Sequence, residues 1–192
     1  MREMHHIEML HRRIVVSGDE VAFKKLFLEL AGPLRQFAVT IIHSKEQAEE
    51  IVEDVFINLW QHRQTLDDVK NLRVYLYVAT KNTALNYLHK KTGRHQYDFT
   101  DYTDVELAAT DPNPEQIFIT SEMRRRIDDV VQQLPPKCKL IFKMAKEDRL
   151  KYREIADILN ISVKTIDNQL AIALKKISEA INFKQAKSSV RY

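Results

Sequence analysis

Apolar residues recur along this chain at intervals of three and four positions, and the pattern breaks off at a few well-marked places. Such spacing puts apolar side chains on one face of an α-helix. No stretch sustains the alternation of apolar and polar residues that a half-buried β-strand would need. The pattern predicts an all-α fold, with helices over residues 4–16, 19–30, 33–42, 45–62, 70–91, 114–134, 136–147, 151–159 and 163–182.

Short polar signals mark the expected helix ends. Gly32-Pro33 predicts a break, with Pro33 in the first turn of the following helix. Ser44 and Gln47 form a capping-box pattern at the start of the helix over 45–62. The helix over 70–91 is apolar on most sides, so we expect it at the centre of an N-terminal bundle.

Residues 95–113, "HQYDFTDYTDVELAATDPN", are acidic and lack periodicity, which is typical of a flexible linker. The linker predicts two small helical domains, residues 1–94 and 114–192. Charge follows the same division, because residues 98–122 carry −7 and residues 123–192 carry +8, although the whole chain carries only +3. A basic C-terminal third indicates either a polyanion partner or an ordinary solvated helical surface.

Several classes of protein are disfavoured by composition. The three glycines are too few for Gly-rich phosphate loops, and the single cysteine, Cys138, allows no internal disulfide. Cys138 is expected to be a small core residue, and a redox role has no support. The N-terminus is charged and lacks a long apolar core, so we expect no membrane insertion and a cytoplasmic location.

The stretch "REIADILNISVKTIDNQLAIALKK", residues 153–176, interrupts one helical pattern and restarts it in a new phase. Asn160 tolerates the left-handed conformation that ends helices, and Ser162 is a suitable N-cap for the next helix. Ile161 and Ile166 occupy the positions of a hydrophobic staple. The pattern therefore predicts a helix-turn-helix.

The second helix of this motif divides into two faces. Its predicted inward residues are Ile166, Leu170, Ala173, Leu174 and Ile177, and in the helix before it Tyr152, Ile155, Ala156 and Leu159 share one face. Its predicted outward residues are Lys164, Thr165, Asn168, Ala171, Ile172 and Lys175, with Gln169 on the flank. Asn and Gln can bond adenine edges and Lys can bind phosphates, which favours DNA binding over a plain helical hairpin.

The motifs of both halves resemble the extracytoplasmic-function sigma factors of bacterial RNA polymerase. "GDEVAFKKLF", "AEEIVEDVFINLWQHR" and "NLRVYLYVATKNTALNYLHKK" are similar to the second conserved region of that family. "LPPKCKLIFKMAKEDRLKYREIADILNISVKTIDNQLAIALKKI" is similar to its fourth region. The resemblance covers about residues 15–182, and the N-terminal half is most similar to the iron-transport-type members.

The resemblance implies a role for each helix and names the partners: core RNA polymerase, promoter DNA and a membrane-bound anti-sigma factor. Polymerase would be bound by Glu50, Glu53, Asp54, Phe56, Asn58, Trp60 and Gln61. The minus-ten element would be bound by Arg73, Lys81, Asn82, Lys90, Lys91 and Arg94. The minus-thirty-five element would be bound by Lys164, Thr165, Asn168, Gln169, Ala171 and Lys175. Such a protein needs no cofactor or metal and has no catalytic residue.

The chain departs from the family pattern at a few positions. Many relatives have Trp at the position of Tyr75, and many have Arg in the helix that here reads "IDNQLAIA". Asp167 would repel phosphates unless it faces a cytosine amino group or the helix N-terminus. The base preferences of the relatives are therefore not expected to transfer to this chain.

Two other functions remain to be compared with this one. A free-standing helix-turn-helix regulator would explain the C-terminal half but not the N-terminal motifs. A nuclease could use the acidic patch of Glu49, Glu50, Glu53 and Asp54, but no His or further acid is placed to complete a metal site. Trp60 is expected to be core more often than interface, because most aromatic residues in an apolar stripe are buried.

Overall fold

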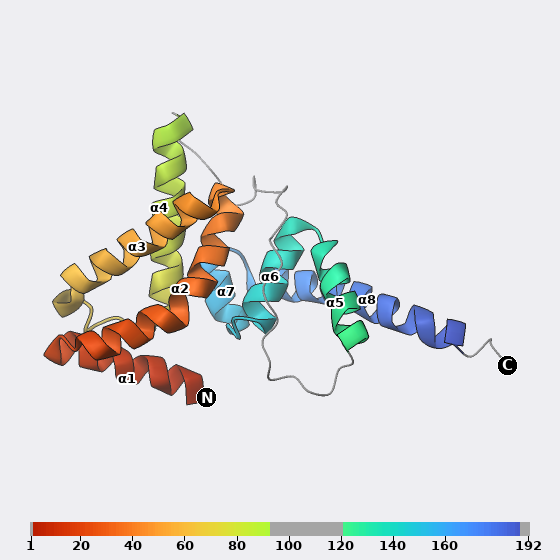
Figure 1. Ribbon diagram of the computed structural model, residues 1–192, viewed down its shortest axis with the longest axis horizontal. Helices are drawn as coiled ribbons and strands as arrows, with labels where there is room; N and C mark the ends of the chain where they lie inside the picture. The colour runs from red at the N-terminus through yellow and green to blue at the C-terminus, as the bar shows by residue number, and fades with distance from the viewer. Residues whose placement is uncertain (1, 93–120, 189–192) are drawn as a thin grey trace. The chain divides into compact units, whose positions relative to one another are not determined.

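A computed structural model describes residues 2–92 and 121–188, and within these ranges the protein is helical with short turns and contains no strand (Figure 1). The chain divides into two compact units, residues 1–101 and 102–192. The prediction of an all-α fold is confirmed. The predicted linker and the start of a helix at residue 114 lie outside the described residues, as do the domain boundaries. No helix within the described ranges is long and apolar enough to cross a membrane.

The described part of the first unit, residues 2–92, holds four α-helices and a short 3-10 turn. They are α1 (Arg2–Ser17), α2 (Glu20–Ile42), α3 (Lys45–Gln61), η1 (Arg63–Thr65) and α4 (Leu72–Thr92). Helix α2 packs against α1, α3 and α4, and its inward face is buried along its whole length. Helix α4 also contacts α1, α2 and α3, but Tyr75 on its outer side is 39% exposed, so α2 is the central helix rather than the one predicted.

The predicted break at Gly32-Pro33 is wrong, because α2 continues through Pro33. Proline removes one helical hydrogen bond and its ring crowds the preceding residue. Gly32 has no Cβ to meet that ring, and Figure 1 shows α2 changing direction about midway. Leu30 and Leu34, on either side, are both almost fully buried, and their packing keeps the two halves of α2 in one helix.

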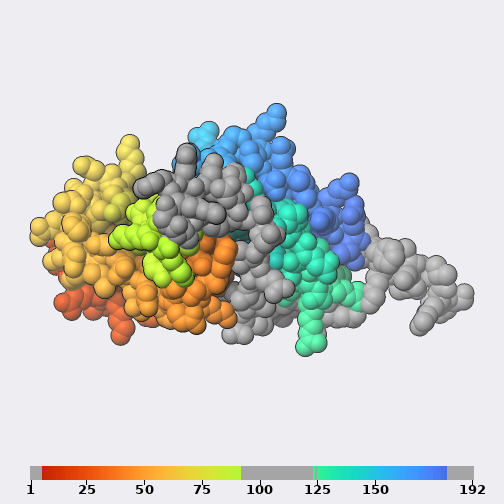
Figure 2. All heavy atoms as spheres, turned by 90° about the horizontal axis from the view of Figure 1, so that it is seen from above, coloured from red at the N-terminus to blue at the C-terminus, as the bar shows by residue number. Residues whose placement is uncertain are grey.

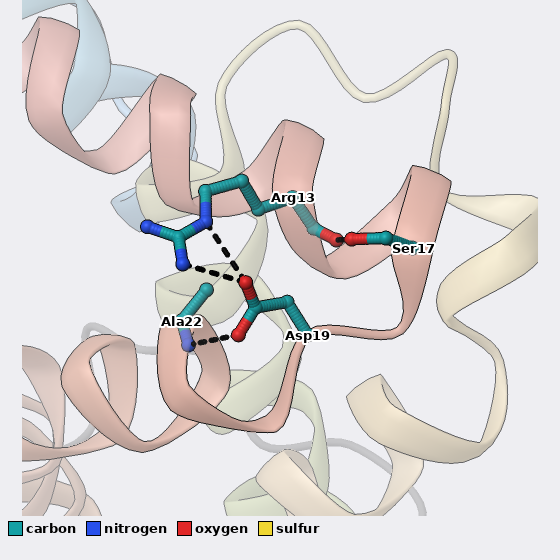
Figure 3. Close-up of polar contacts among 4 residues, drawn as sticks. All are labelled: Arg13, Ser17, Asp19 and Ala22. Carbon is teal, nitrogen blue, oxygen red and sulfur yellow. Dashed lines mark hydrogen bonds and ion pairs between the residues drawn. The ribbon is translucent and has the colours of Figure 1, made fainter.

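The start of α2 is fixed by one carboxylate with two kinds of partner (Figure 3). Asp19 Oδ1 accepts a hydrogen bond of 2.9 Å from the backbone N–H of Ala22, which makes Asp19 the N-cap. Asp19 Oδ2 accepts bonds of 2.9 and 2.6 Å from Arg13 Nε and Nη2 at the end of α1. These bonds join α1 to α2 across the Gly18 turn. Ser44 is the N-cap of α3 and accepts a hydrogen bond of 3.3 Å from the backbone N–H of Gln47, which is the serine half of the predicted capping box.

The second unit is formed by α5 (Ser121–Gln132), α6 (Pro136–Lys146), α7 (Tyr152–Leu159) and α8 (Val163–Ser188). Helices α5 and α6 both pack on α8, and α7 packs on α8 and α6. The core between α5, α6 and α8 contains Val131, Leu134, Cys138, Ala173 and Ile177. Helix α8 runs six residues further than the predicted end at 182, since no glycine or proline interrupts residues 183–188.

We predict that the Arg13–Asp19 contact makes the stability of the first unit pH-dependent. The backbone N–H of Ala22, and then Arg13, lower the pKa of Asp19. A lowered pKa means that the charged form stabilises the fold above the ordinary Asp pKa of about 3.9, and that this contribution is lost as the pH falls through the folded-state value. Asp19→Asn keeps a cap acceptor but loses the charge, so its melting temperature should fall below wild type near neutral pH.

The deficit should begin to shrink as the pH falls below the ordinary Asp pKa of about 3.9, and it should vanish below the lowered folded-state pKa, where the folded wild-type carboxylate is also neutral. Melting curves of wild type, Asp19→Asn and Asp19→Ala across the pH range measure this effect. Asp68→Asn, at an exposed aspartate outside any helix cap, serves as the control. A deficit for Asp19→Asn that stays constant down to acid pH would contradict the electrostatic account.

Candidate nucleic-acid interface

The turn between α7 and α8 has the predicted geometry. Asn160 is left-handed, with φ 54° and ψ 48°, and its backbone N–H donates to the carbonyl oxygen of Ala156. Ser162 Oγ accepts a hydrogen bond of 3.1 Å from the N–H of Thr165, and the two hydroxyl oxygens lie 2.9 Å apart. The left-handed residue ends α7 and the serine starts α8 two residues later, so the chain forms the predicted helix-turn-helix.

Burial fixes the orientation of α8 about its own axis. Ile166, Leu170, Ala173 and Ile177 are each 9% exposed or less, and they form one stripe against the rest of the unit. Leu174 was predicted to join them but is 49% exposed, because it lies at the edge of the stripe next to Asp167. In α7, Tyr152 is likewise exposed and Ile158 is buried in its place, which corrects the predicted inward face of that helix.

The opposite side of α8 carries the residues predicted to face DNA. Part of α8, in blue, lies at the surface in Figure 2. Lys164, Asn168, Ala171 and Lys175 are all exposed. They recur at intervals of three and four and so form one stripe. Thr165 and Gln169 are half-buried on the flank, and the Thr165 hydroxyl already contacts Ser162. The side chain of Lys175 is 78% exposed and lies 4.0 Å from Glu179.

Cys138 links α6 to the middle of α8. Its Sγ donates a hydrogen bond of 3.2 Å to the carbonyl oxygen of Gln169, and the residue is fully buried. Burial raises the pKa of the Cys138 thiol, partly opposed by the positive charge of Lys176. A buried, protonated thiol is a poor nucleophile, so this cysteine is a packing residue in the described structure.

On α3, one exposed stripe carries most of the residues predicted to bind a protein partner, and the gold atoms of this helix are open to view in Figure 2. Glu50, Glu53, Asp54, Asn58 and Gln61 are exposed. Ile57 lies among them and is 53% exposed. Sequence reasoning missed Ile57, although its spacing of seven from Glu50 places it on the same stripe.

Phe56, which was also predicted to bind polymerase, lies inside the unit and not on that surface. Phe56 is only 2% exposed, and its ring lies 4.9 Å from Phe27 and 6.0 Å from Phe23. Trp60 is intermediate: its ring lies 4.9 Å from Phe23, and the guanidinium of Arg63 lies 4.4 Å from the ring centroid. The aromatic residues of α3 therefore hold α3 on α2, and the exposed stripe is acidic with one apolar residue.

The acidic patch does not assemble a metal site. Glu49 lies one turn before Glu53, and its Oε1 is 2.6 Å from Arg35 Nη1, so this carboxylate is paired with an arginine. Across the described residues, no group of three or more His, Cys, Asp or Glu side chains could hold a metal ion. A two-metal nuclease therefore gains no support from these helices.

The residues predicted on α4 do not form a single surface. Asn82 is exposed and shares one face with Tyr75 and Asn86, which the sequence-based set left out. Arg73 lies nine residues before Asn82, which at 3.6 residues per turn is half a rotation away, and its Nε is buried. Partial burial lowers the pKa of Lys81.

At the C-terminal end of α4, Lys90 and Lys91 are exposed. Arg94 lies outside the described residues. The structure thus brings Asn82 together with Tyr75 and Asn86 and separates it from Arg73.

Comparison with known families matches each unit to one region of the same family. Residues 26–94 match Sigma-70 region 2, and residues 124–177 match Sigma-70 region 4. The chain is 22% identical over 173 residues to the RNA polymerase sigma-H factor of Pseudomonas aeruginosa, covering 87% of this chain and 90% of that protein. It is 24% identical over 176 residues to the ECF RNA polymerase sigma factor SigW of Bacillus subtilis, covering 84% and 91%.

Two solved structures share the fold. One is CnrH in complex with the cytosolic domain of CnrY, with a TM-score of 0.54, 16% identity, and coverage of 92% of this chain and 97% of that chain. The other is the sigma factor RpoE in complex with the anti-sigma factor NepR from Bartonella quintana, with a TM-score of 0.54, 19% identity, and coverage of 83% and 96%.

Two leucines of α8 give a matched test of the orientation of this helix. Leu170 is 2% exposed, so Leu170→Ala should cost about 2–5 kcal/mol and melt the second unit at lower temperature. Leu174 is 49% exposed, so Leu174→Ala should change stability by about 0.5 kcal/mol or less. Thermal melting of both variants measures the difference. Equal losses for the two leucines would mean that α8 is rotated from the orientation described.

Proposed function

Since this chain belongs to the sigma-70 family, as a sigma factor of the extracytoplasmic-function group, we propose how its two units divide the work of initiation. A sigma factor binds core RNA polymerase and promoter DNA and directs transcription initiation. Members of this family are DNA-binding initiation factors, and polymerase carries out the catalysis. The observation that carries the assignment is the match of both region 2 and region 4 in one chain and in that order.

In this proposal α8 enters the major groove at the minus-thirty-five element. The buried stripe of α8 leaves Lys164, Asn168 and Lys175 pointing away from the core. A major groove about 12 Å wide admits a helix, and an exposed asparagine at the centre of such a face can bond an adenine edge. The lysines at the two ends of the stripe suit the phosphates on either side of that base pair.

Helix α4 is proposed to hold the minus-ten element as single-stranded DNA. Asn82, Asn86 and Tyr75 share its exposed face, and an amide beside an aromatic ring can bond and stack an unpaired base. Lys90 lies further along the same side of the helix and suits a phosphate of the strand. Lys91 is nine residues after Asn82 and therefore, like Arg73, lies half a rotation away from it. Lys81 adds charge at the flank of that face. Arg73 is not part of this surface.

Helix α3 is proposed to dock on the largest subunits of polymerase through its exposed stripe. Interfaces with an apolar anchor inside a polar rim bind well, and Ile57 among Glu50, Glu53 and Asp54 has that composition. Asn58 and Gln61 extend the polar rim. Trp60 supports the stripe from its side.

An anti-sigma factor is the further partner that the relatives suggest. The solved complexes pair CnrH with the cytosolic domain of CnrY and RpoE with NepR. We propose a membrane-bound anti-sigma partner for this chain and a cytoplasmic location, where polymerase acts. The domain boundaries 1–94, 95–113 and 114–192 and the iron-transport-type subgroup also remain proposals, the latter resting on the N-terminal motifs.

Run-off transcription with core polymerase on a promoter library tests the function. Selective initiation from a subset of promoters is expected. A free-standing regulator is the competing function, and it would bind a specific operator without polymerase. That function is disfavoured because a net charge of only +3 gives the free chain little non-specific attraction to DNA. Tight, specific binding by the free protein and no copurification with polymerase would favour it instead.

Charge reversal on α3 tests the docking surface. Glu53→Lys should weaken binding to core polymerase by roughly tenfold or more, because like charges brought together across an interface cost several kcal/mol. Asp157→Lys, which makes the same charge change on the exposed side of α7, is the control and should bind core normally. The affinity is measured by titrating labelled protein with core polymerase. Equal losses for the two variants would exclude a specific role of the α3 stripe.

The role of Asn82 is tested by Asn82→Ala. Loss of a side-chain hydrogen bond to a base should lower open-complex formation by about 3- to 10-fold while core binding stays unchanged. Gln36→Ala removes another exposed amide, on α2, and should leave both steps unaffected. Permanganate footprinting of unpaired thymines measures opening. If Asn82→Ala lost core binding to the same extent, Asn82 would be a structural residue.

On α8, base contacts and phosphate contacts should differ in their dependence on sequence. Asn168→Ala should cost about 1–3 kcal/mol and relax preference at one or two base pairs. Lys164→Ala and Lys175→Ala should each weaken binding to all promoter sequences about equally. Each should also reduce the slope of log affinity against log salt concentration by roughly one unit. Promoter selection and salt titration with each variant on core polymerase measure both effects. An unchanged minus-thirty-five preference for Asn168→Ala would rule out this docking geometry.

A further inference from the structure

Ile172 is an apolar residue on the polar, outward side of α8. It is 44% exposed, whereas the inward residues Ile166, Leu170 and Ala173 are each 2% exposed or less. At 100° per residue, Ile172 lies well over a quarter-turn from the centre of the buried stripe, so it is not the edge of the core. It stands one turn after Asn168, on the same ridge of the helix.

The neighbours of Ile172 are the residues proposed to meet DNA. Asn168 precedes it by four positions and Thr165 by seven, while Lys175 and Lys176 follow within the next turn. When this surface enters a groove, the DNA group that contacts Ile172 is desolvated. A base edge or phosphate without a partner there would weaken binding, because an isoleucine side chain neither donates nor accepts a hydrogen bond.

The C5 methyl of thymine is the one methyl group on the floor of the major groove, and apolar side chains contact it. An isoleucine in a helix holds nearly one χ1 rotamer, so it loses little side-chain entropy when it packs against a fixed methyl group. We propose that Ile172 contacts the C5 methyl of one thymine and so specifies a T·A pair in the minus-thirty-five element. This inference rests on the proposed docking of α8 and adds a residue that reads sequence without hydrogen bonds.

The position of that thymine relative to Asn168 follows from helix geometry. Four residues of α-helix rise about 6 Å, and successive base pairs are about 3.4 Å apart. The thymine therefore lies within about two base pairs of the pair that Asn168 contacts, on either strand.

Deoxyuridine is the sharpest probe, because it differs from thymidine only by the missing methyl group. A promoter obtained by selection with the wild-type holoenzyme is resynthesised with single thymine-to-uracil changes through the minus-thirty-five element, on each strand in turn. Competition for open-complex formation then gives the thymine/uracil preference at every position. At one position near the Asn168 contact, replacing thymine by uracil should lower open-complex formation about fourfold, the factor that corresponds to burying one methyl group.

Three variants connect that preference to the side chain. Ile172→Ser should reduce the preference at that one position to about unity, and Ile172→Val, which keeps an apolar branch, should retain most of it. Leu174→Ser is the matched control, because Leu174 is an equally exposed apolar residue on the Asp167 side of the helix. It should leave the preference intact. Melting curves of the free proteins show that each variant folds.

The outcomes separate this inference from the proposed function. If the holoenzyme initiates and Asn168→Ala alters the minus-thirty-five preference, α8 docks as proposed. Three results would then overturn the role of Ile172 alone. They are equal open-complex formation on all thymine-to-uracil promoters, a thymine preference that survives Ile172→Ser, and a selected element without thymine near the Asn168 contact. Failure to initiate from any promoter, or an Asn168→Ala variant with unchanged preference, would overturn the proposed function instead.

Discussion

The orientation of α8 about its own axis is the constraint on which the DNA-binding surface depends. The residues of a helix that do not pack against its neighbours are exposed to solvent. In α8, the burial of Ile166, Leu170, Ala173 and Ile177 determines which residues those are. The bond from Cys138 to the carbonyl oxygen of Gln169 and the cap at Ser162 fix the axial position and the start of the helix. A rotation of one residue, about 100°, would bury a charged residue, Asp167 or Lys176 according to its direction, and would expose Leu170, which costs energy on both counts.

Packing also determines which residues are exposed on α3 and α4, and the exposed face of each helix has a different chemical character. On α3, Phe56 packs against Phe23 and Phe27, and this packing leaves the acidic stripe on the side of the helix that faces solvent. On α4, the buried row that includes Leu76, Tyr77 and Thr80 leaves two asparagines and a tyrosine exposed. One rule of packing therefore produces an acidic face suited to a protein and two faces suited to nucleic acid. Each outward face lies on a helix held by its neighbours, which keeps the contact residues in register.

The positive charge of the C-terminal third is offset in the sequence by the acidic segment that precedes it. The segment 98–122 carries −7 and nearly cancels the +8 of the residues that follow it. Because the electrostatic term supplies most non-specific affinity for DNA, a chain with this balance gains little from binding random sequence. In the proposed complex with polymerase, selectivity depends on a few side chains such as Asn168 and Ile172. This balance suits a factor that acts only as part of a larger complex.

The sequence by itself determined the helical class, the position of most helix ends, the helix-turn-helix and the family, because these follow from local periodicity, capping and motif order. Asn160 and Ser162 act as their residue types predict, since a cap needs only neighbouring backbone. Tertiary structure decided which of several adjacent apolar residues is buried, as on α8, where Leu170 is buried but Leu174 is not. It also carried α2 through Pro33, because burial of Leu30 and Leu34 outweighs a broken hydrogen bond. Burial depends on which neighbours arrive from elsewhere in the chain, and periodicity alone does not encode that.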